Sequence, residues 1–524
     1  MAPAGRIAAM AAALASIVAC GTRVPSPDPP AGRMAGGPVT VDIDQGPLIG
    51  KMTEGGVRAF LGVPYAAPPV GDLRWRPPAP APRWTQPRDA RQVGPACPQA
   101  DVPSYARADE DCLSLNVWSP ASGSPNKPIL FWIPGGGFVE GSGGYQLYDG
   151  ARLAAREDAV VVTINYRIGP LGFMAHPALA RELGRPASPS FGFLDQRAAL
   201  QWVRRNARVF GGDPANVTIF GQSAGAFSVC AHLAMPGSRG LFARAIMQSG
   251  ACADPLYFSR RQAEAPGQKL AEAVGCRDMA CLRAKDVQTI LGALPLKRRY
   301  LLPPGVNWGP VVDGVELPTL PLRALRDGRA AKVPLLIGWN RDEGILHTAF
   351  YPSVSDADRD DFVRSAFGEA AVAPVRARYA GVDPKQALNT IVTEGAFACE
   401  ARRAALAQAS HGNPTYLYEF TRPLASPRFH ALGATHNVEL WFVFGTEEAG
   451  IALAPSELPL SHAMMDAWGR FARSGDPNGA GLVWPRYDGA RDELAVLDTT
   501  PGAGTANPRG ACDFWDQFER DVEP

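Results

Sequence analysis

The sequence predicts an α/β fold with a large, mainly parallel central sheet. Short and nearly continuous apolar runs alternate with helical patterns, and such runs are typical of strands buried on both faces. The runs are PILFWI (128–133), AVVVTIN (159–165), NVTIFG (216–221), ARAIMQS (243–249), VPLLIG (333–338) and TYLYEF (415–420). This alternation indicates parallel strands joined by helices, and functional sites in such sheets gather at the carboxyl ends of the strands.

The individual patterns begin at about residue 38. The stretches VTVDIDQGPLIGKM (39–52) and GVRAFLGVPY (56–65) alternate as a β-hairpin and an adjoining strand do. The stretch FLDQRAALQWVRRNARVF (193–210) spaces its apolar residues three and four positions apart, which indicates a helix. No repeat period appears and no second linker like residues 22–37 follows, so the pattern indicates one long domain.

Composition and charge narrow the class of protein. The chain has 524 residues, 46% of them apolar and 20% charged, and its formal net charge is +1. A chain this long and apolar can bury a large core, which excludes wholesale disorder. Proteins that bind nucleic acids usually carry a positively charged patch, and this chain has a balanced charge and no basic run. The composition therefore indicates a large globular enzyme and no nucleic-acid partner.

The N-terminal residues predict export. Residues 7–18 form an apolar run of about a dozen residues, whereas a helix that spans a bilayer needs about 20. An arginine before the run and small residues after it are typical of a secretory signal peptide. The run ends IVACG (17–21), which looks like a bacterial lipoprotein signal and implies cleavage before Cys20 and lipid on its sulfur. An ordinary signal peptide, in which Cys20 is incidental, is the alternative.

Residues 21–37 are rich in proline and glycine and suit a solvated tether after a signal peptide of residues 1–20. We therefore expect an exported protein that is lipid-anchored to a bacterial cell envelope, or otherwise secreted or periplasmic. Membrane contact is expected only through this anchor.

A candidate nucleophile follows the third apolar run. The segment Gly221-Gln222-Ser223-Ala224-Gly225 lies between the strand-like NVTIF and the helix-like AFSVCAHLAM. This is a G-x-S-x-G motif in a strand–turn–helix context, where the glycines permit a strained turn that exposes the serine hydroxyl. The alternative is a tight turn with an ordinary surface serine, which this context disfavours.

A nucleophilic serine needs a base, and the base needs an acid that orients it. In enzymes with this motif the chain order is serine, then Asp or Glu, then His. Asp342 or Glu343 could supply the acid, since both directly follow the run VPLLIG. His430 or His436 could supply the base after YLYEF, so the residues alone leave two acids and two histidines open.

A glycine run suits an oxyanion hole. The segment IPGGGF (133–138) closes the run PILFWI, and glycines let backbone N–H groups approach a substrate closely. The segment matches neither G-x-G-x-x-G nor a P-loop, so phosphate binding is not expected.

Motifs for metal binding are missing from the sequence. The chain has no C-x-x-C pair and no H-E-x-x-H. Its acidic stretch SVSDADRDDF (353–362) predicts a capped helix start rather than a Ca²⁺ loop. We therefore expect no metal and no cofactor.

These motifs together resemble the type-B carboxylesterase/lipase family, the cholinesterase-like α/β-hydrolases that include bacterial para-nitrobenzyl esterases. FGGDPANVTIFGQSAG (210–225) resembles the serine signature of the family, and EDCLSLNVWSP (110–120) resembles its second signature, with Ser114 where the family prefers Tyr, Phe or Thr. The similarity continues through the segments NYRIGPLGF (165–173), PVVDG (310–314), WNRDEG (339–344), THNVELWFVFG (435–445) and CDFWDQF (512–518).

The resemblance implies one α/β-hydrolase domain over residues 38–520 that hydrolyses small-molecule carboxylic esters through an acyl-serine intermediate. Carried over by position, it implies a nucleophile, an orienting acid and a general base at Ser223, Glu343 and His436. It implies oxyanion-hole N–H groups at Gly136, Gly137 and Ala224. A lipase that acts at lipid interfaces is the alternative, and a non-catalytic binding protein is disfavoured because all three triad positions are present.

The family pattern also implies three disulfides among the eight cysteines after Cys20, which are Cys97–Cys112, Cys276–Cys281 and Cys399–Cys512. Cys230 and Cys252 have no family partner, and they are expected either as small buried hydrophobes or bonded to each other.

Two features depart from the family. Pro134 stands where His or Tyr usually precedes the glycines, and it removes an N–H that the oxyanion hole does not use. The loop 97–112 has Tyr105 as its sole aromatic residue, so it lacks the tryptophan that binds choline in cholinesterases.

Overall fold

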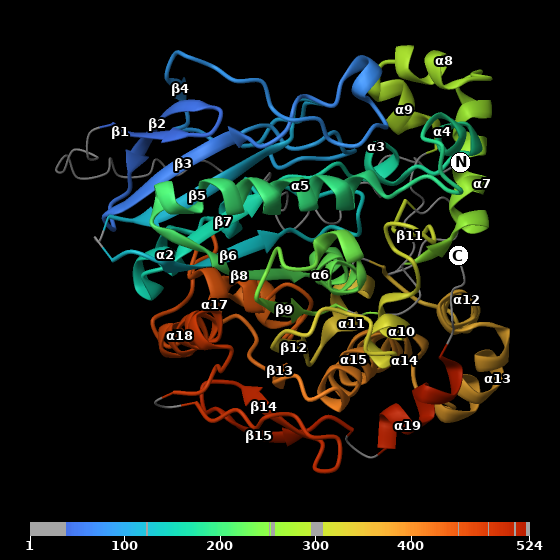
Figure 1. Ribbon diagram of the computed structural model, residues 1–524. Helices are drawn as coiled ribbons and strands as arrows, with labels where there is room; N and C mark the ends of the chain where they lie inside the picture. Colours follow the sequence, from blue (N-terminus) through green and yellow to red (C-terminus); the bar gives the residue numbers. More distant parts are fainter. Residues whose placement is uncertain are drawn as a thin grey trace, which may run out of the picture.

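The predicted apolar runs are strands of one sheet. The computed structural model describes residues 38–121, 124–250, 252, 257–294, 308–349, 351–448, 450–479, 482–507 and 510–519. The predicted signal peptide, its Cys20 and the tether 21–37 lie outside this part of the chain. Within it, 13 strands form the main sheet, and helices cover both faces (Figure 1).

The sheet has a parallel centre and antiparallel ends. Its strand order is β1 (Val39–Ile43), β2 (Gly46–Met52), β3 (Val57–Pro64), β5 (Ser114–Pro120), β7 (Val160–Ile164), β6 (Lys127–Ile133), β8 (Gly212–Gln222), β9 (Arg244–Gln248), β12 (Leu335–Asn340), β13 (Thr415–Phe420), β14 (Glu493–Leu497) and β15 (Gly502–Thr505). Neighbours from β7 to β14 run parallel. All six predicted runs belong to this parallel block, which confirms the predicted fold class.

The remaining strands are short. β4 (Arg88–Asp89) pairs with β2, and a separate two-stranded sheet joins β10 (Phe258–Ser259) to β11 (Val311–Val312). The alternating N-terminal stretches form the hairpin β1–β2 and the adjoining β3, as predicted.

Helices bury the two faces of the sheet. α5 (Phe191–Asn206), α6 (Ala224–Ala234) and α15 (Cys399–Ser410) pack on one face, and α2 (Ala151–Glu157), α17 (Glu439–Phe444) and α18 (Leu458–Ser474) pack on the other. The other helices are α3 (Gly169–Phe173), α4 (Pro177–Glu182), α7 (Arg260–Ala273), α8 (Met279–Ala284), α9 (Val287–Ala293), α10 (Pro321–Arg326), α11 (Glu343–Thr348), α12 (Asp356–Phe367), α13 (Glu369–Arg378), α14 (Pro384–Ile391), α16 (Pro427–His430) and α19 (Ala511–Trp515). In the described residues, no helix combines the length and the apolar character needed to cross a membrane.

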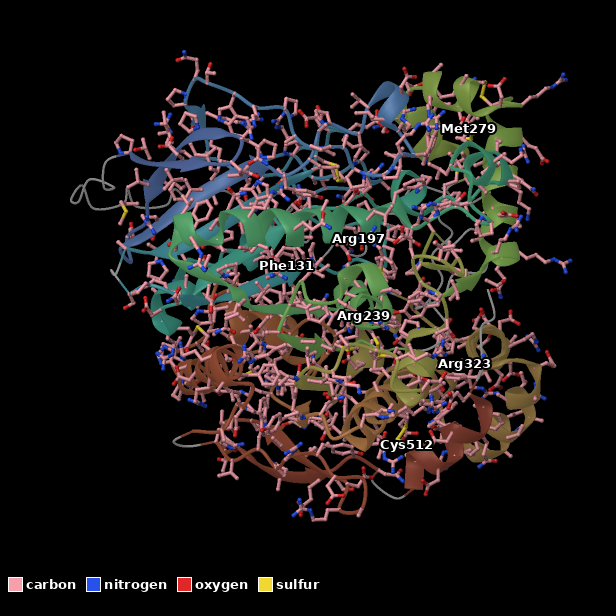
Figure 2. The ribbon with its side chains drawn as sticks, viewed as in Figure 1. Phe131, Arg197, Arg239, Met279, Arg323 and Cys512 are labelled. Carbon is pink, nitrogen blue, oxygen red and sulfur yellow. A yellow bond between two sulfur atoms is a disulfide. The ribbon has the colours of Figure 1, made fainter. Side chains whose placement is uncertain are left out.

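The double-sided burial explains why the strands read as continuous apolar runs. In β6, Phe131 faces the core beneath α5 and α6, and Figure 2 marks it within the sheet. The neighbouring Leu130 and Trp132 belong to the opposite core, beneath α2, α17 and α18. Successive side chains of a strand point to opposite faces, so a strand covered on both sides has no polar face.

The acidic stretch at 353–362 is a capped helix start, as predicted. The Ser355 hydroxyl accepts a hydrogen bond from the Asp358 N–H, and the Asp358 carboxylate accepts one from the Ser355 N–H. This reciprocal pair is a capping box at the start of α12, and it satisfies two N–H groups that have no partner within the helix.

Four disulfides cross-link the described chain, over sequence separations of 5 to 113 residues. Three are the pairs that the family resemblance implies, Cys97–Cys112, Cys276–Cys281 and Cys399–Cys512, the last of which places Cys512 at α19 in Figure 2. The fourth joins Cys230 in α6 to Cys252, which follows β9. The two cysteines without a family partner are therefore bonded to each other.

We expect the Cys399–Cys512 bond to stabilise the fold most per bond, because it closes a loop of 113 residues, against 5 for Cys276–Cys281. By loop entropy, a cross-link of the first length restricts the unfolded chain by about 4–5 kcal/mol and the second by about half of that. The double variant Cys399→Ala/Cys512→Ala should therefore melt at a lower temperature than Cys276→Ala/Cys281→Ala in calorimetry. Equal melting temperatures would contradict this ranking.

Candidate active site

The turn at Ser223 is strained and tightly packed. Ser223 lies between β8 and α6 with φ +56° and ψ −127°, a conformation that non-glycine residues rarely adopt. A Cβ at Gly225 would lie 2.0 Å from the Ile133 carbonyl oxygen, and one at Gly221 would lie 2.5 Å from the Gly225 carbonyl carbon. Both glycines of the motif are therefore required by close backbone approach. The Ser223 N–H donates to the Gln248 carbonyl at 3.0 Å, which holds the turn against the end of β9.

The glycine loop lies directly beside this turn. β6 and β8 are parallel neighbours, and Ile133 pairs with Gly221 at their carboxyl ends. Gly136 and Gly137 have φ values of +115° and +59°, which glycine adopts without strain. Ala224 is the first residue of α6, so its N–H is one of those that no carbonyl of the helix can accept. The three predicted oxyanion-hole positions thus lie on segments that meet next to Ser223.

The proline before the glycines has a structural partner of its own. The Pro134 carbonyl accepts a hydrogen bond of 2.9 Å from the Tyr166 hydroxyl. This bond fixes the start of the glycine loop through a backbone atom, so the loop is anchored without a polar side chain at position 134.

Glu343 and His436 form a buried carboxylate–imidazole pair. Glu343 begins α11 after β12, and His436 lies in the loop that follows β13, the parallel neighbour of β12. His436 Nδ1 and Glu343 Oε2 are 2.5 Å apart, and Glu343 Oε1 accepts a 2.8 Å hydrogen bond from the Asn340 N–H. Both side chains are buried. A proton on Nδ1 leaves the lone pair on Nε2 available for a proton from a nucleophile.

The other acid and the other histidine have different partners. Asp342 Oδ2 accepts a 2.8 Å hydrogen bond from the Ala434 N–H and forms an ion pair of 3.2 Å with Arg341. His430 is exposed, and its Nδ1 lies 3.2 Å from the Leu424 carbonyl oxygen. The structure therefore brings Glu343 to His436 and does not bring Asp342 or His430 to this site. Asp342 instead joins the loop after β12 to the loop that carries His436.

Three contacts of His436 have no counterpart in the sequence prediction. The Gln222 amide nitrogen lies 3.1 Å from His436 Nε2, and the rings of Phe397 and His347 lie 5.1 and 5.4 Å from the His436 ring. Gln222 occupies the first variable position of the G-x-S-x-G motif, so the motif itself could have drawn attention to it. Phe397 belongs to a π-helical turn (Val392–Ala398) and carries no sequence signal.

A second buried carboxyl lies behind this pair. Glu439 at the start of α17 accepts hydrogen bonds from Asn340 Nδ2 at 2.6 Å and from Gln248 Nε2 at 3.2 Å. Burial, followed by the nearby Glu343 carboxylate, raises the pKa of Glu439 to about 7. Because Glu439 is partly protonated near neutral pH, the like charge that Glu343 experiences is reduced.

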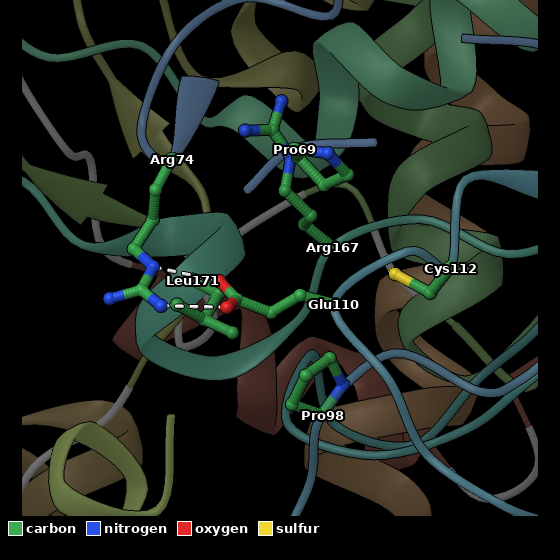
Figure 3. A pocket seen from close by; sticks show the side chains of 7 residues that line it. All are labelled: Pro69, Arg74, Pro98, Glu110, Cys112, Arg167 and Leu171. Atoms are coloured by element: carbon green, nitrogen blue, oxygen red, sulfur yellow. Dashed lines mark hydrogen bonds and ion pairs between the residues drawn. The ribbon is translucent and has the colours of Figure 1, made fainter. Parts of the chain in front are cut away.

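The loop 97–112 is held by polar contacts rather than by aromatic packing alone. The Tyr105 hydroxyl donates to Glu448 Oε1 at 2.7 Å, and the Tyr105 ring contacts Tyr145 with centroids 6.4 Å apart. Near the other end of the loop, the Arg74 guanidinium binds both carboxylate oxygens of Glu110 at 2.7 and 2.6 Å. Figure 3 shows this pair within a small pocket, which is lined by Pro69, Arg74, Pro98, Glu110, Cys112, Arg167 and Leu171.

Arg74 also donates to the carbonyls of Arg283 and Lys285 at the end of α8. The pocket of Figure 3 is therefore a structural junction between the loop 97–112 and α8, and its lining residues are different from those around Ser223.

Comparison with known proteins agrees with this architecture. Residues 37–515 match the carboxylesterase family over nearly the whole described chain. The chain belongs to the carboxylesterase family. It is 37% identical to the para-nitrobenzyl esterase of Bacillus subtilis (strain 168), over 85% of this chain and 92% of that protein. It is also 37% identical to the fumonisin B1 esterase of Sphingopyxis macrogoltabida, over 88% of this chain and 87% of the relative.

Solved structures agree with the sequence relatives. A PNB esterase structure superimposes with a TM-score of 0.82 at 35% identity, covering 91% of this chain and 99% of that one. This carboxylesterase therefore has the α/β-hydrolase fold, as expected, and it is a carboxylic ester hydrolase.

We expect Glu343, and not Asp342, to control the activity of His436. Glu343→Gln removes the charge that stabilises a protonated imidazole, and loss of a triad carboxylate typically costs about 10³–10⁴-fold in kcat. Asp342→Asn keeps an oxygen that can accept from the Ala434 N–H and should retain most of the activity. Hydrolysis of a para-nitrophenyl ester by the two purified variants, with melting temperatures as the folding control, measures the difference. A larger loss in Asp342→Asn would contradict the pairing.

Proposed function

We propose that this esterase cleaves small-molecule carboxylic esters with Ser223 as nucleophile, His436 as general base and Glu343 as the acid that orients the imidazole. The observation that carries the proposal is the buried 2.5 Å contact between Glu343 and His436, whose Nε2 lies 3.1 Å from the amide nitrogen of Gln222, the residue before Ser223 in the strained turn. Relatives named for hydrolysis of para-nitrobenzyl esters and of fumonisin B1 support small esters as substrates.

In acylation, the Ser223 hydroxyl attacks the ester carbonyl carbon while its proton passes to His436 Nε2. The imidazole then carries a positive charge, which the Glu343 carboxylate stabilises from the Nδ1 side. The carbonyl oxygen becomes an oxyanion, and the N–H groups of Gly136, Gly137 and Ala224 would receive it. Collapse of the tetrahedral intermediate expels the alkoxide, which takes the proton from Nε2 and leaves as the alcohol.

Deacylation repeats these steps with water. His436 removes a proton from water as the oxygen attacks the acyl-serine, a second oxyanion forms in the same place, and the carboxylic acid leaves as Ser223 recovers its proton. Every proton in this cycle moves through one nitrogen, Nε2 of His436.

Active-site labelling tests this proposal. Intact protein treated with a fluorophosphonate probe should carry the adduct on Ser223, located by peptide mass spectrometry. Ser223→Ala should lose the label and about 10⁴-fold or more of its turnover, as removal of a triad nucleophile does. Ser353→Ala changes an exposed serine far along the chain and serves as the control, which should keep both. An adduct at another residue, or near-normal turnover by Ser223→Ala, would refute the assignment.

We also propose that the mature protein begins at a lipid-modified Cys20, that this lipid anchors it to a bacterial cell envelope, and that residues 21–37 are a tether. The sequence IVACG (17–21) after an apolar run supports this, although these residues lie outside the described structure. Expressed in a bacterial host, the full chain should fractionate with membranes and incorporate labelled fatty acid. Cys20→Ser should abolish both, and an unlabelled chain with an N-terminus elsewhere would contradict lipidation.

A further inference from the structure

The base nitrogen of the proposed triad already has a partner. The Gln222 amide nitrogen lies 3.1 Å from His436 Nε2, and Gln222 is buried. Gln222 is the last residue of β8 and pairs with Gln248 of β9, so the sheet fixes its backbone. Its amide oxygen lies on the glycine loop, since a Cβ at Gly135 would be 3.1 Å from it. The amide therefore lies between the glycine loop and the imidazole.

The contact of Glu343 with His436 Nδ1 determines which partner donates in the hydrogen bond between Gln222 and Nε2. Glu343 faces His436 Nδ1, so the neutral imidazole carries its proton there and offers a lone pair at Nε2. The amide N–H of Gln222 then donates to Nε2. This is the same lone pair that must accept the proton of Ser223 in the proposed mechanism, so Gln222 and Ser223 share one acceptor.

The Gln222 amide can form a hydrogen bond with His436 Nε2 whether the imidazole is neutral or protonated. When His436 becomes protonated, Nε2–H turns into a donor, and rotation of the amide by half a turn presents its oxygen as the acceptor. A carboxylate at this position could only accept, and it would favour the charged imidazole. An apolar side chain could do neither.

The charged groups around His436 explain why it matters that the Gln222 amide is neutral. Glu343 at the start of α11 contacts Nδ1, Glu439 at the start of α17 interacts with the ring electrostatically, and His347 of α11 contacts its face. Two carboxyl groups thus already lie near the imidazole. A third at position 222 would keep the base protonated, and so inactive, to higher pH.

We infer that Gln222 is a positioning residue of this esterase, whose neutral amide holds the imidazole of His436 at Nε2 and sets the pH range in which that nitrogen can act as a base. The inference rests on the proposed roles of Ser223 and His436. It concerns a residue that acts through His436.

Two variants test the inference. In Gln222→Glu, a carboxylate next to Nε2 should move the acidic limb of the kcat/KM–pH profile upward by about one unit or more. In Gln222→Met, which is neutral and similar in size, the limb should stay in place. Loss of the hydrogen bond should lower kcat by about three- to tenfold with KM little changed. Gln386→Glu adds the same charge on the exposed surface of α14 and should leave the profile unchanged.

The outcomes are distinct from those of the proposed function. If the fluorophosphonate labels Ser223 in both variants but Gln222→Glu has the wild-type profile, the inference on Gln222 is wrong and the triad stands. If neither the wild type nor the variants are labelled at Ser223, the proposed function itself fails. Should Gln222→Glu not fold, Gln222→Met decides alone, because an unchanged kcat in that variant would overturn the inference.

Discussion

The site depends on one close backbone contact, that of the serine turn with the end of β6. Gly225 lies so near the Ile133 carbonyl that any side chain at position 225 would collide with it, and Ile133 pairs with Gly221 in the sheet. This contact places the glycine loop beside Ser223 and keeps Ser223 in a backbone conformation that an isolated chain would avoid. The surrounding packing must supply the energy of that strain.

The acid and the base are brought together by a second feature, the parallel pairing of β12 with β13. Both strands end at the same edge, so the loops that follow them are neighbours. Two hydrogen bonds between Asp342 and Ala434 fasten these loops, which leaves Glu343 and His436 facing each other. Because the Asn340 N–H and His436 Nδ1 both contact Glu343, its buried carboxyl group is hydrogen-bonded at each oxygen.

Much of the architecture was predictable because burial on both sides of a sheet leaves a local signature. The six apolar runs are all strands of the parallel block, and the capped helix at Ser355 begins where the acidic stretch indicates. The serine turn was also predictable, because its close backbone contacts require glycine at two fixed positions and the sequence shows both in G-x-S-x-G. Phe397 left no such trace, because a π-helical turn and a tertiary ring contact have no local pattern.

By itself the sequence determined the fold class, the serine turn and the glycine loop, since each rests on periodicity or on glycine at fixed spacing. The residues alone left Asp342 and Glu343 equal, and likewise His430 and His436, until the family resemblance favoured one of each. Only the tertiary structure decided which side chains meet, together with the Cys230–Cys252 bond and the contact of Gln222 with His436. The physical reason is that adjacent residues after a strand point in different directions, and only the packed neighbouring loops select one.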